Sequence, residues 1–499
     1  MSVPATVSGT HRPWPDEPAV SPPPRQLRRG WWLAPVAVAV LVLPGTWSLG
    51  LLAVALAARF LLAAARAQRT AAQARAGTPR GGIVLGVEAS GRRIVLSERQ
   101  LTAHGLILGA SGAGKTTTLL RILTAQIERG RPVVAIDLKG SPTFARELRD
   151  SAAAAGRPFR LWTPEGPSVW NPLAHGGATE LKDKLIATER FTEPHYQRAA
   201  ERYLQIAVQV MHASPTRRPV TLDAVVDMLE PARLAVAARD LPPARAERVR
   251  EYLAGLTPDA LSAVRGMAAR LAIISESDTG RYLTAPAAPG TPVVDLRAAL
   301  AGDAVVLFSL NSSTFGKLSA QLGTLAVQDL VAASGHRLAS SPHPPHEPAL
   351  VGIDEFSALG SDNLVALLAR GREAGVSVLL ATQELADLER AARGMRDQIL
   401  GNTSVKIAHR QDVPGSAETV ARMIGTVRVW ERTYHLQPGM LGISDRRRGT
   451  LRQIDQFAID PNRIRTLGTG EAVVIVKTPH ASARVARITP PQIRDGRER

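Results

Sequence analysis

The feature that most constrains this chain is a glycine-rich octapeptide between an apolar stretch, GLIL, and a helix-forming stretch, TTTLLRIL. It consists of Gly109, Ala110, Ser111, Gly112, Ala113, Gly114, Lys115 and Thr116. These residues fit the pattern G-x-x-x-x-G-K-[ST] without deviation, in the strand–loop–helix context that the pattern requires. A glycine-rich turn that matched by chance would lack this context. The sequence therefore predicts a phosphate-binding P-loop at the carboxyl end of a buried strand.

The chemistry of phosphate binding explains this composition. Successive backbone N–H groups must approach the phosphate oxygens closely, and larger side chains would obstruct that approach. The helix that follows presents the positive end of its dipole to the anionic phosphates. We expect Lys115 to contact the β- and γ-phosphates, Thr116 to ligate magnesium, and Thr117 to complete the nucleotide-binding segment. ATP and Mg²⁺ are thus the predicted cofactors.

A second motif, ALVGIDEF at residues 349–356, ends near two carboxylates. Its apolar residues predict a buried strand, so Asp354 would lie at the carboxyl end of that strand, beside the P-loop. There Asp354 can hold magnesium through water, and Glu355 can orient and deprotonate the attacking water. An acidic pair after a strand is, on its own, more often a helix N-cap. Together with the P-loop, the catalytic interpretation is favoured.

Further polar residues end other predicted elements. Gln383 closes the strand VSVLLATQ and is a candidate for sensing the γ-phosphate or holding the water; a solvent-facing strand end is the alternative. Arg370 and Arg372 lie in LLARGREAG. If subunits form a ring, such an arginine could reach a neighbour's γ-phosphate, and a solvated helix end is the alternative. Asp137 and Lys139, in AIDLKG, end another strand near the site, and their role is open.

Two classes of P-loop protein are disfavoured by the sequence. It has no N-K-x-D guanine-reading motif, which argues against a GTPase, and no L-S-G-G-Q motif, which argues against an ABC transporter subunit. An Asp-Glu motif far along the chain from the P-loop fits ATP-driven motors better than small-molecule kinases. The absence of Cys excludes disulfides and thiolate sites. The net charge of +17 makes a polyanionic partner or an anionic membrane surface plausible, or reflects charges solvated around the surface.

Apolar strand patterns alternate with helical ones along most of the chain. GGIVLGV and RRIVLS flank the turn EASG and predict a β-hairpin, and strands follow in the P-loop region and after residue 286. Leu, Ala and Arg recur at helical spacing from about 178 to 285, which predicts an all-helical insertion. Alternation of this kind predicts an α/β fold with a mostly parallel sheet covered on both faces. The basic end, from Arg484 to Arg499, is expected to be frayed.

The N-terminal region predicts a membrane anchor. No charged residue occurs from Trp31 to Ala58, and only Arg59 interrupts apolar sequence as far as Ala65. This stretch is longer than one span requires, and Pro44 and Gly45 form a turn near its middle. Arginines flank both ends, so the positive-inside rule favours a hairpin with both ends in the cytoplasm over a single span. A cleaved signal peptide is disfavoured, because no convincing small-residue cleavage site precedes further apolar sequence.

These patterns divide the chain into seven segments. They are a disordered Pro-rich cytoplasmic tail (1–29), a transmembrane hairpin (30–66), a linker (67–81), the first part of a nucleotide-binding domain (82–177), an all-α inserted domain (178–285), the second part of the nucleotide-binding domain (286–482) and a basic C-terminal tail (483–499).

Six stretches together resemble the TraG/TraD family, the coupling proteins of conjugative type IV secretion within the FtsK/HerA group of DNA-pumping ATPases. They are LILGASGAGKTT, VVAIDLKGS, WNPL, GIDEFSALG, LARGREAGVSVLLATQELADLE and ILGNTSVKIAHR with AETVARMIGT. The resemblance covers roughly residues 82–430. It implies a RecA-like P-loop ATPase domain with an inserted helical domain, a homo-hexameric ring below the bacterial inner membrane, and an ATPase domain in the cytoplasm. In this family the motor pumps single-stranded DNA with an attached relaxase toward the secretion channel.

Carried over to this chain, the resemblance implies roles for individual residues. Lys115 and Thr116 match the phosphate and magnesium residues, Asp354 and Glu355 the acidic pair, Gln383 the γ-phosphate-sensing glutamine, and Arg372 the trans-acting arginine. The near absence of an external loop in the membrane hairpin departs from the family. Two alternatives stay open: an FtsK-like motor for double-stranded DNA, and a receptor that recruits protein cargo and uses ATP only to switch conformation.

Overall fold

The computed structural model describes residues 82–189, 191, 193–215, 218–340, 347–359, 361–439 and 442–491. The predicted tail (1–29), membrane hairpin (30–66) and linker (67–81) lie outside these residues. The chain divides into two compact units at residue 77, and every described residue belongs to the second, Thr78–Arg499. Within the described ranges, no helix is both long enough and apolar enough to cross a bilayer.

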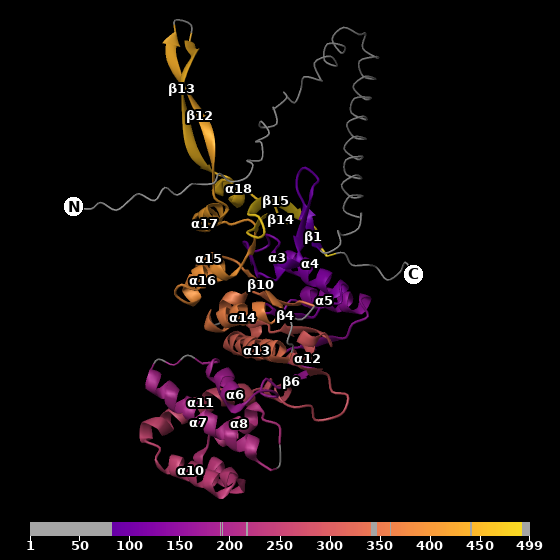
Figure 1. Ribbon diagram of the computed structural model, residues 1–499, viewed down its shortest axis with the longest axis vertical. Coiled ribbons are helices and arrows are strands. Elements are labelled where there is room, and N and C mark those ends of the chain that lie inside the picture. The colour runs from indigo at the N-terminus through magenta and orange to yellow at the C-terminus, as the bar shows by residue number, and fades with distance from the viewer. Residues whose placement is uncertain are drawn as a thin grey trace, which may run out of the picture. The chain divides into compact units, whose positions relative to one another are not determined.

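A sheet of eleven strands forms the centre of this unit (Figure 1). Seven adjacent strands are parallel, in the order β11-β3-β10-β9-β4-β8-β5. They are β3 (Gly105–Leu108), β4 (Val133–Asp137), β5 (Phe159–Trp162), β8 (Val305–Ser309), β9 (Ala349–Asp354), β10 (Val376–Thr382) and β11 (Val405–Ala408). The predicted α/β fold with a mostly parallel sheet is confirmed.

Four antiparallel strands extend this sheet beyond β11, in the order β14-β15-β1-β2. They are β14 (Glu471–Val476), β15 (Ser482–Ile488), β1 (Gly82–Val87) and β2 (Arg93–Ser97), and β1 and β2 form the predicted hairpin. The prediction of a frayed basic end from Arg484 was wrong as far as residue 488. In β15 the buried Ala486 and Ile488 alternate with Arg487, and the arginines obscured this period of two. The boundary placed at 482/483 therefore moves to the end of β15.

Helices cover both faces of the sheet and form a hydrophobic core on each face. Successive residues of one strand therefore pack into different cores. In β4, Val133 and Ala135 pack with α4 (Lys115–Glu128) and α5 (Pro142–Ala154), whereas Val134 and Ile136 pack with α13 (Ser312–Ser340) and α14 (Ser361–Glu373). Burial on both faces explains why these strands are apolar throughout. The remaining helices outside 178–285 are α3 (Glu98–Leu101), α12 (Leu296–Ala301), α15 (Leu385–Ala391), α16 (Met395–Asn402), α17 (Pro414–Ile424) and α18 (Pro461–Arg465).

The described part of residues 178–285 contains helices and no strand, gathered as one bundle (Figure 1). The α-helices are α6 (Ala178–Ile186), α7 (Pro194–Ala213), α8 (Leu222–Met228), α9 (Pro231–Ala237), α10 (Pro243–Ala254) and α11 (Pro258–Ser275). A buried ion pair joins this bundle to the rest of the fold: Lys184 Nζ on α6 lies 2.8 Å from Asp329 Oδ1 on α13. The Nε1 of Trp170, from the WNPL motif, donates to the other oxygen of Asp329 at 3.0 Å.

Two small sheets complete the described fold. β6 (Val169–Trp170) pairs with β7 (Val293–Val294) in parallel. β12 (Thr426–Gly439) and β13 (Gly442–Phe457) form a long antiparallel ribbon, which the sequence analysis did not predict. Charged residues are frequent in both ribbon strands, and residues 426–431 and 451–457 are mostly exposed. Exposed strand segments do not need the apolar alternation that identifies a strand buried on one face.

We expect Lys184→Met to lower the free energy of unfolding by about 3–5 kcal/mol, because it leaves the carboxylate of Asp329 buried without its cation. The side chains of Lys184 and Asp329 are only 2% and 9% exposed. Urea denaturation of the purified full-length chain measures this loss, with the exposed Lys317→Met as the control. Equal midpoints for the two variants would contradict the assigned role of the ion pair.

Candidate active site

The P-loop joins β3 to α4 in a conformation that glycine makes possible. Gly112 and Gly114 have φ values of +72° and +117°, a region that other residues rarely adopt. A Cβ atom on Gly109 would lie 2.6 Å from the Cβ of His409, so a larger residue would displace the loop from its support. These constraints hold the loop open at its tip, where Ser111 and Gly112 are exposed.

Lys115, the first residue of α4, turns its side chain back into the loop. Its Nζ donates to the carbonyl oxygens of Gly109, at 2.6 Å, and Ala110, at 3.2 Å. The residue is only 4% exposed, and burial, followed by repulsion from Lys139, lowers the pKa of its ammonium group. Carbonyl oxygens do not neutralise a buried cation, whereas a phosphate would. The loop therefore fits a nucleotide triphosphate.

Asp354 lies next to the P-loop, as the sequence predicted. The strand order β3-β10-β9 brings the carboxyl ends of these strands together, and the Thr116 hydroxyl donates to Asp354 Oδ2 at 2.9 Å. Asp354 is 1% exposed, and burial raises the pKa of its carboxyl group despite the opposing effect of Lys139. A divalent cation would remove this penalty. No cluster of three or more metal-binding side chains occurs in the described ranges.

Glu355 and Gln383 also meet at this edge of the sheet. Glu355 has a left-handed backbone with φ of +59°, an unusual conformation for a residue with a side chain. Its N–H donates to Asp354 Oδ1 at 3.0 Å, and Gln383 Nε2 donates to its carboxylate oxygen Oε1. The second carboxylate oxygen, Oε2, lies 3.0 Å from Lys139 Nζ. The strained backbone thus aims the carboxylate between two side chains from neighbouring strands.

Arg372 lies apart from these residues. It is exposed in the last turn of α14, and its charge acts on His104, which immediately precedes β3. His104 Nε2 bonds to the carbonyl oxygen of Leu368 on the same helix at 2.8 Å. Since the P-loop follows the other end of β3, Arg372 lies at the opposite edge of the sheet from the site of its own chain. Arg370 lines a separate cavity beside α6 and α13.

The structure adds His409 to the site, a residue that the sequence analysis did not select. His409 follows β11 and is fully buried behind the P-loop. Its Nδ1 donates to the Glu471 carbonyl oxygen at 2.9 Å, so Nε2 accepts from the Thr118 hydroxyl at 2.8 Å. Burial, followed by the charge of Lys115, lowers the pKa of His409 to about 4, so the ring is neutral. Its position directly after a buried strand, like that of Gln383, was the only indication in the sequence.

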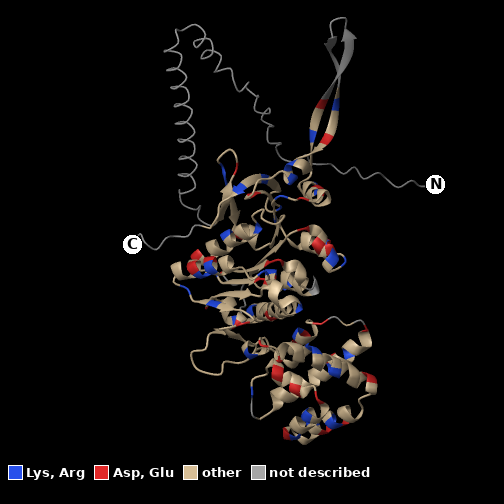
Figure 2. Ribbon diagram, turned by 180° about the vertical axis from the view of Figure 1, so that it is seen from behind, with Lys and Arg blue, Asp and Glu red and all other residues tan. Residues whose placement is uncertain are grey.

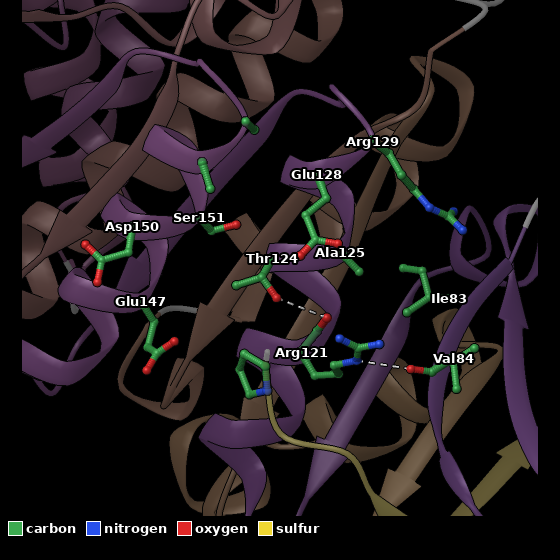
Figure 3. A pocket seen from close by; sticks show the side chains of 13 residues that line it. Ile83, Val84, Arg121, Thr124, Ala125, Glu128, Arg129, Glu147, Asp150 and Ser151 are labelled. Carbon is green, nitrogen blue, oxygen red and sulfur yellow. Dashed lines mark hydrogen bonds between the residues drawn. The ribbon is translucent and has the colours of Figure 1, made fainter. Parts of the chain in front are cut away.

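The cavity drawn in Figure 3 is not the nucleotide site. It has a volume of about 410 Å³ and lies between β1, α4 and α5, without any P-loop residue in its lining. Glu128, Glu147 and Asp150 line it, and these carboxylates would repel a triphosphate. Two half-buried arginines, Arg121 and Arg129, also line it, and Arg121 donates through Nε to the Val84 carbonyl oxygen at 3.1 Å.

With this geometry in place, two family models match the chain. Residues 348–468 match a model described as the TraM recognition site of TraD and TraG, and residues 65–134 match the FtsK/SpoIIIE family. The resemblance to the TraG/TraD family is confirmed. The FtsK/SpoIIIE match includes the P-loop and, with the geometry above, places the chain among the P-loop ATPases. No curated protein sequence matches the chain.

Solved structures share the fold of this chain. The chain is similar to the bacterial conjugative coupling protein TrwB in an unbound form, with a TM-score of 0.57 and 15% identity over 84% of this chain and 90% of that one. TrwB in complex with ADP and Mg²⁺ gives a TM-score of 0.55 and 14% identity over 84% and 97%. VirB4 of Thermoanaerobacter pseudethanolicus gives 0.52 and 15% over 83% and 98%.

We expect His409→Gln to reduce the amount by which the free energy of unfolding falls as the pH drops below neutral. The pKa of His409 is lower in the folded chain than the ordinary value of 6.5, so between pH 6.5 and about 4 the unfolded chain binds the extra proton. Stability is therefore lost as the pH falls through this window, by about 2 kcal/mol between pH 7 and pH 5 for one such histidine. Urea midpoints across that range measure the slope.

The exposed His336→Gln is the matched control and should keep the slope of the unmodified chain. An unchanged slope in His409→Gln would show that His409 does not titrate in this way.

Proposed function

We propose that this chain is a membrane-anchored, ATP-driven DNA translocase that acts as the coupling protein of a conjugative type IV secretion system. The observation that carries the proposal is the contact between Thr116 and Asp354, which brings the P-loop and the acidic pair into one site. Glu355 and Gln383 lie beside them. The groups needed to bind a triphosphate and to activate the attacking water therefore meet at the carboxyl ends of neighbouring strands.

Each residue of the site has a task in this proposal. The loop from Gly109 to Gly114 surrounds the β- and γ-phosphates with backbone N–H groups, and Lys115 adds a full positive charge. Thr116 and Asp354 hold Mg²⁺, which would neutralise charge that develops on the phosphates, and Thr117 continues the nucleotide-binding turn of α4. Glu355 accepts a proton from the attacking water, and Gln383 orients that water or contacts the γ-phosphate.

A ring of subunits would give Arg372 a role. Its exposed position, far from its own P-loop, suits an arginine that reaches a neighbour's γ-phosphate in a homo-hexamer. The net charge of +17 suits DNA as the partner. Figure 2 shows Lys and Arg interspersed with Asp and Glu along the described elements.

The family match and the N-terminal sequence each support one part of the proposed partners and location. The match to the TraM recognition site supports recruitment of a relaxase or other secreted protein through residues 348–468, and delivery to components of the secretion channel. The apolar stretch from Trp31 to Ala65 supports an anchor in the bacterial inner membrane, with the ATPase domain in the cytoplasm. Single-stranded DNA is the expected substrate.

Two alternatives are each favoured by one observation. The match of residues 65–134 to the FtsK/SpoIIIE family favours a motor for double-stranded DNA. The match of residues 348–468 to a protein-recognition region favours a receptor that binds protein cargo and uses ATP only as a switch. These candidates share the nucleotide site and differ in what stimulates it.

We expect Lys115→Ala to abolish ATP binding, because the triphosphate loses its buried cation. Glu355→Gln should bind ATP normally and lose turnover by about 100-fold or more, since it removes a general base without changing shape. Calorimetric titration with a non-hydrolysable ATP analogue and a phosphate-release assay separate the two effects, and the exposed Glu373→Gln serves as the control. Normal turnover in Glu355→Gln would remove the catalytic assignment.

ATPase activity of the purified full-length chain should rise when single-stranded DNA is added, and this stimulation should weaken steeply with salt, as expected for phosphate contacts. The assay compares single-stranded DNA, double-stranded DNA, a candidate cargo protein and no addition. Stronger stimulation by double-stranded DNA would favour the FtsK-like motor. Stimulation by cargo alone, with neither DNA active, would favour the receptor.

A further inference from the structure

Lys139 contacts Glu355, the general base of the proposed reaction. The sequence analysis left the role of Lys139 open. Its Nζ lies 3.0 Å from Glu355 Oε2, while Gln383 donates to Oε1 of the same carboxylate. The strand order β10-β9-β4 explains this arrangement, because Gln383 follows β10, Glu355 follows β9 and Lys139 follows β4. Each carboxylate oxygen is therefore engaged from a different neighbouring strand.

The carboxylate of Asp137 fixes the turn that contains Lys139. Asp137 Oδ1 accepts from the N–H of Lys139 at 2.9 Å, and Oδ2 accepts from the N–H of Ser141 at 2.6 Å. Ser141 is in turn the N-cap of α5, and its hydroxyl accepts from the N–H of Phe144 at 3.4 Å. The carboxylate of Asp137 is thus occupied in shaping the turn, which leaves the Lys139 side chain directed at Glu355.

The loop after β8 holds the same turn from the other side. The N–H groups of Leu310 and Ser312 donate to the carbonyl oxygens of Asp137 and Leu138 at 2.9 and 2.7 Å. Gly140 has a φ of +70°, and a Cβ atom there would lie 2.6–3.0 Å from the Cβ and backbone of Asn311. Only glycine fits this approach. The sequence Asp137-Leu138-Lys139-Gly140-Ser141 is therefore a rigid support for a single side chain.

We propose that Lys139 is a positioning residue that, together with Gln383, holds the carboxylate of Glu355 in the orientation needed to receive the proton of the attacking water. This inference rests on the proposed function. Lys139 acts through Glu355 and is not itself a ligand of the nucleotide. Its loss should slow the chemical step and leave nucleotide binding intact, because misplacement of a catalytic group by about 1 Å can cost about 100-fold in rate.

The test is a comparison of Lys139→Met, Lys139→Arg and Lys477→Met in the full-length chain. Lys139 is 39% exposed, so its replacement should leave the fold intact. Lys477 is an exposed lysine that directly follows β14 and lies level with the start of β3, at the sheet edge opposite the P-loop. We expect kcat to fall about 10- to 100-fold in Lys139→Met, with the KM for ATP and the Kd of a non-hydrolysable analogue unchanged.

Lys139→Arg should recover part of the lost kcat, and Lys477→Met should behave as the unmodified chain. Gly140→Ala provides a second route, because it disturbs the turn without touching Glu355, and a folded Gly140→Ala should reproduce the Lys139→Met kinetics. An unchanged or raised kcat in Lys139→Met would overturn the inference, and so would a weakened Kd with normal kcat. If Glu355→Gln is inactive in those cases, the proposed function stands and only the role of Lys139 falls.

Discussion

The site depends on one hydrogen bond between segments that are far apart in the sequence. Thr116 and Asp354 are 238 residues apart, yet their side chains meet at 2.9 Å because β3 and β9 flank the same strand, β10. Parallel strands place their carboxyl ends at a common edge, so whatever follows each strand shares that edge. The P-loop, the acidic pair, Gln383 and Lys139 all owe their proximity to this rule of topology.

Burial gives those neighbours their chemistry. Lys115 and Asp354 are almost inaccessible, and burial disfavours the charged form of each group, as the shifts in their pKa values show. Charges kept in a dry pocket interact strongly with an incoming ion of opposite sign. The same sheet that assembles the site therefore prepares it for a magnesium–triphosphate complex, which carries both signs.

Much of this could be predicted from local patterns, and the rest depended on tertiary contacts. The P-loop, the acidic pair and Gln383 each follow an apolar strand, so residue type and spacing were enough. His409 and Lys139 also follow apolar strands, but no motif assigns them a task; their roles appear only once β11 and β4 lie beside their neighbours. β15 was missed because its arginines concealed the alternation of Ala486 and Ile488. The ribbon β12–β13 was missed because its strands lack the apolar alternation by which a half-buried strand is recognised.

The antiparallel extension links the start of the described chain mechanically to the nucleotide loop. Gly86 in β1 pairs with Ile488 in β15, the N–H of Ile488 donates to Gly470 at 2.8 Å, and the N–H of Gly470 donates to Ala113 at 3.0 Å. Tension applied to the polypeptide ahead of Gly82 would therefore reach the P-loop through three consecutive backbone contacts. The position of Ala113 in the P-loop is thus coupled to that of β1 by main-chain contacts alone.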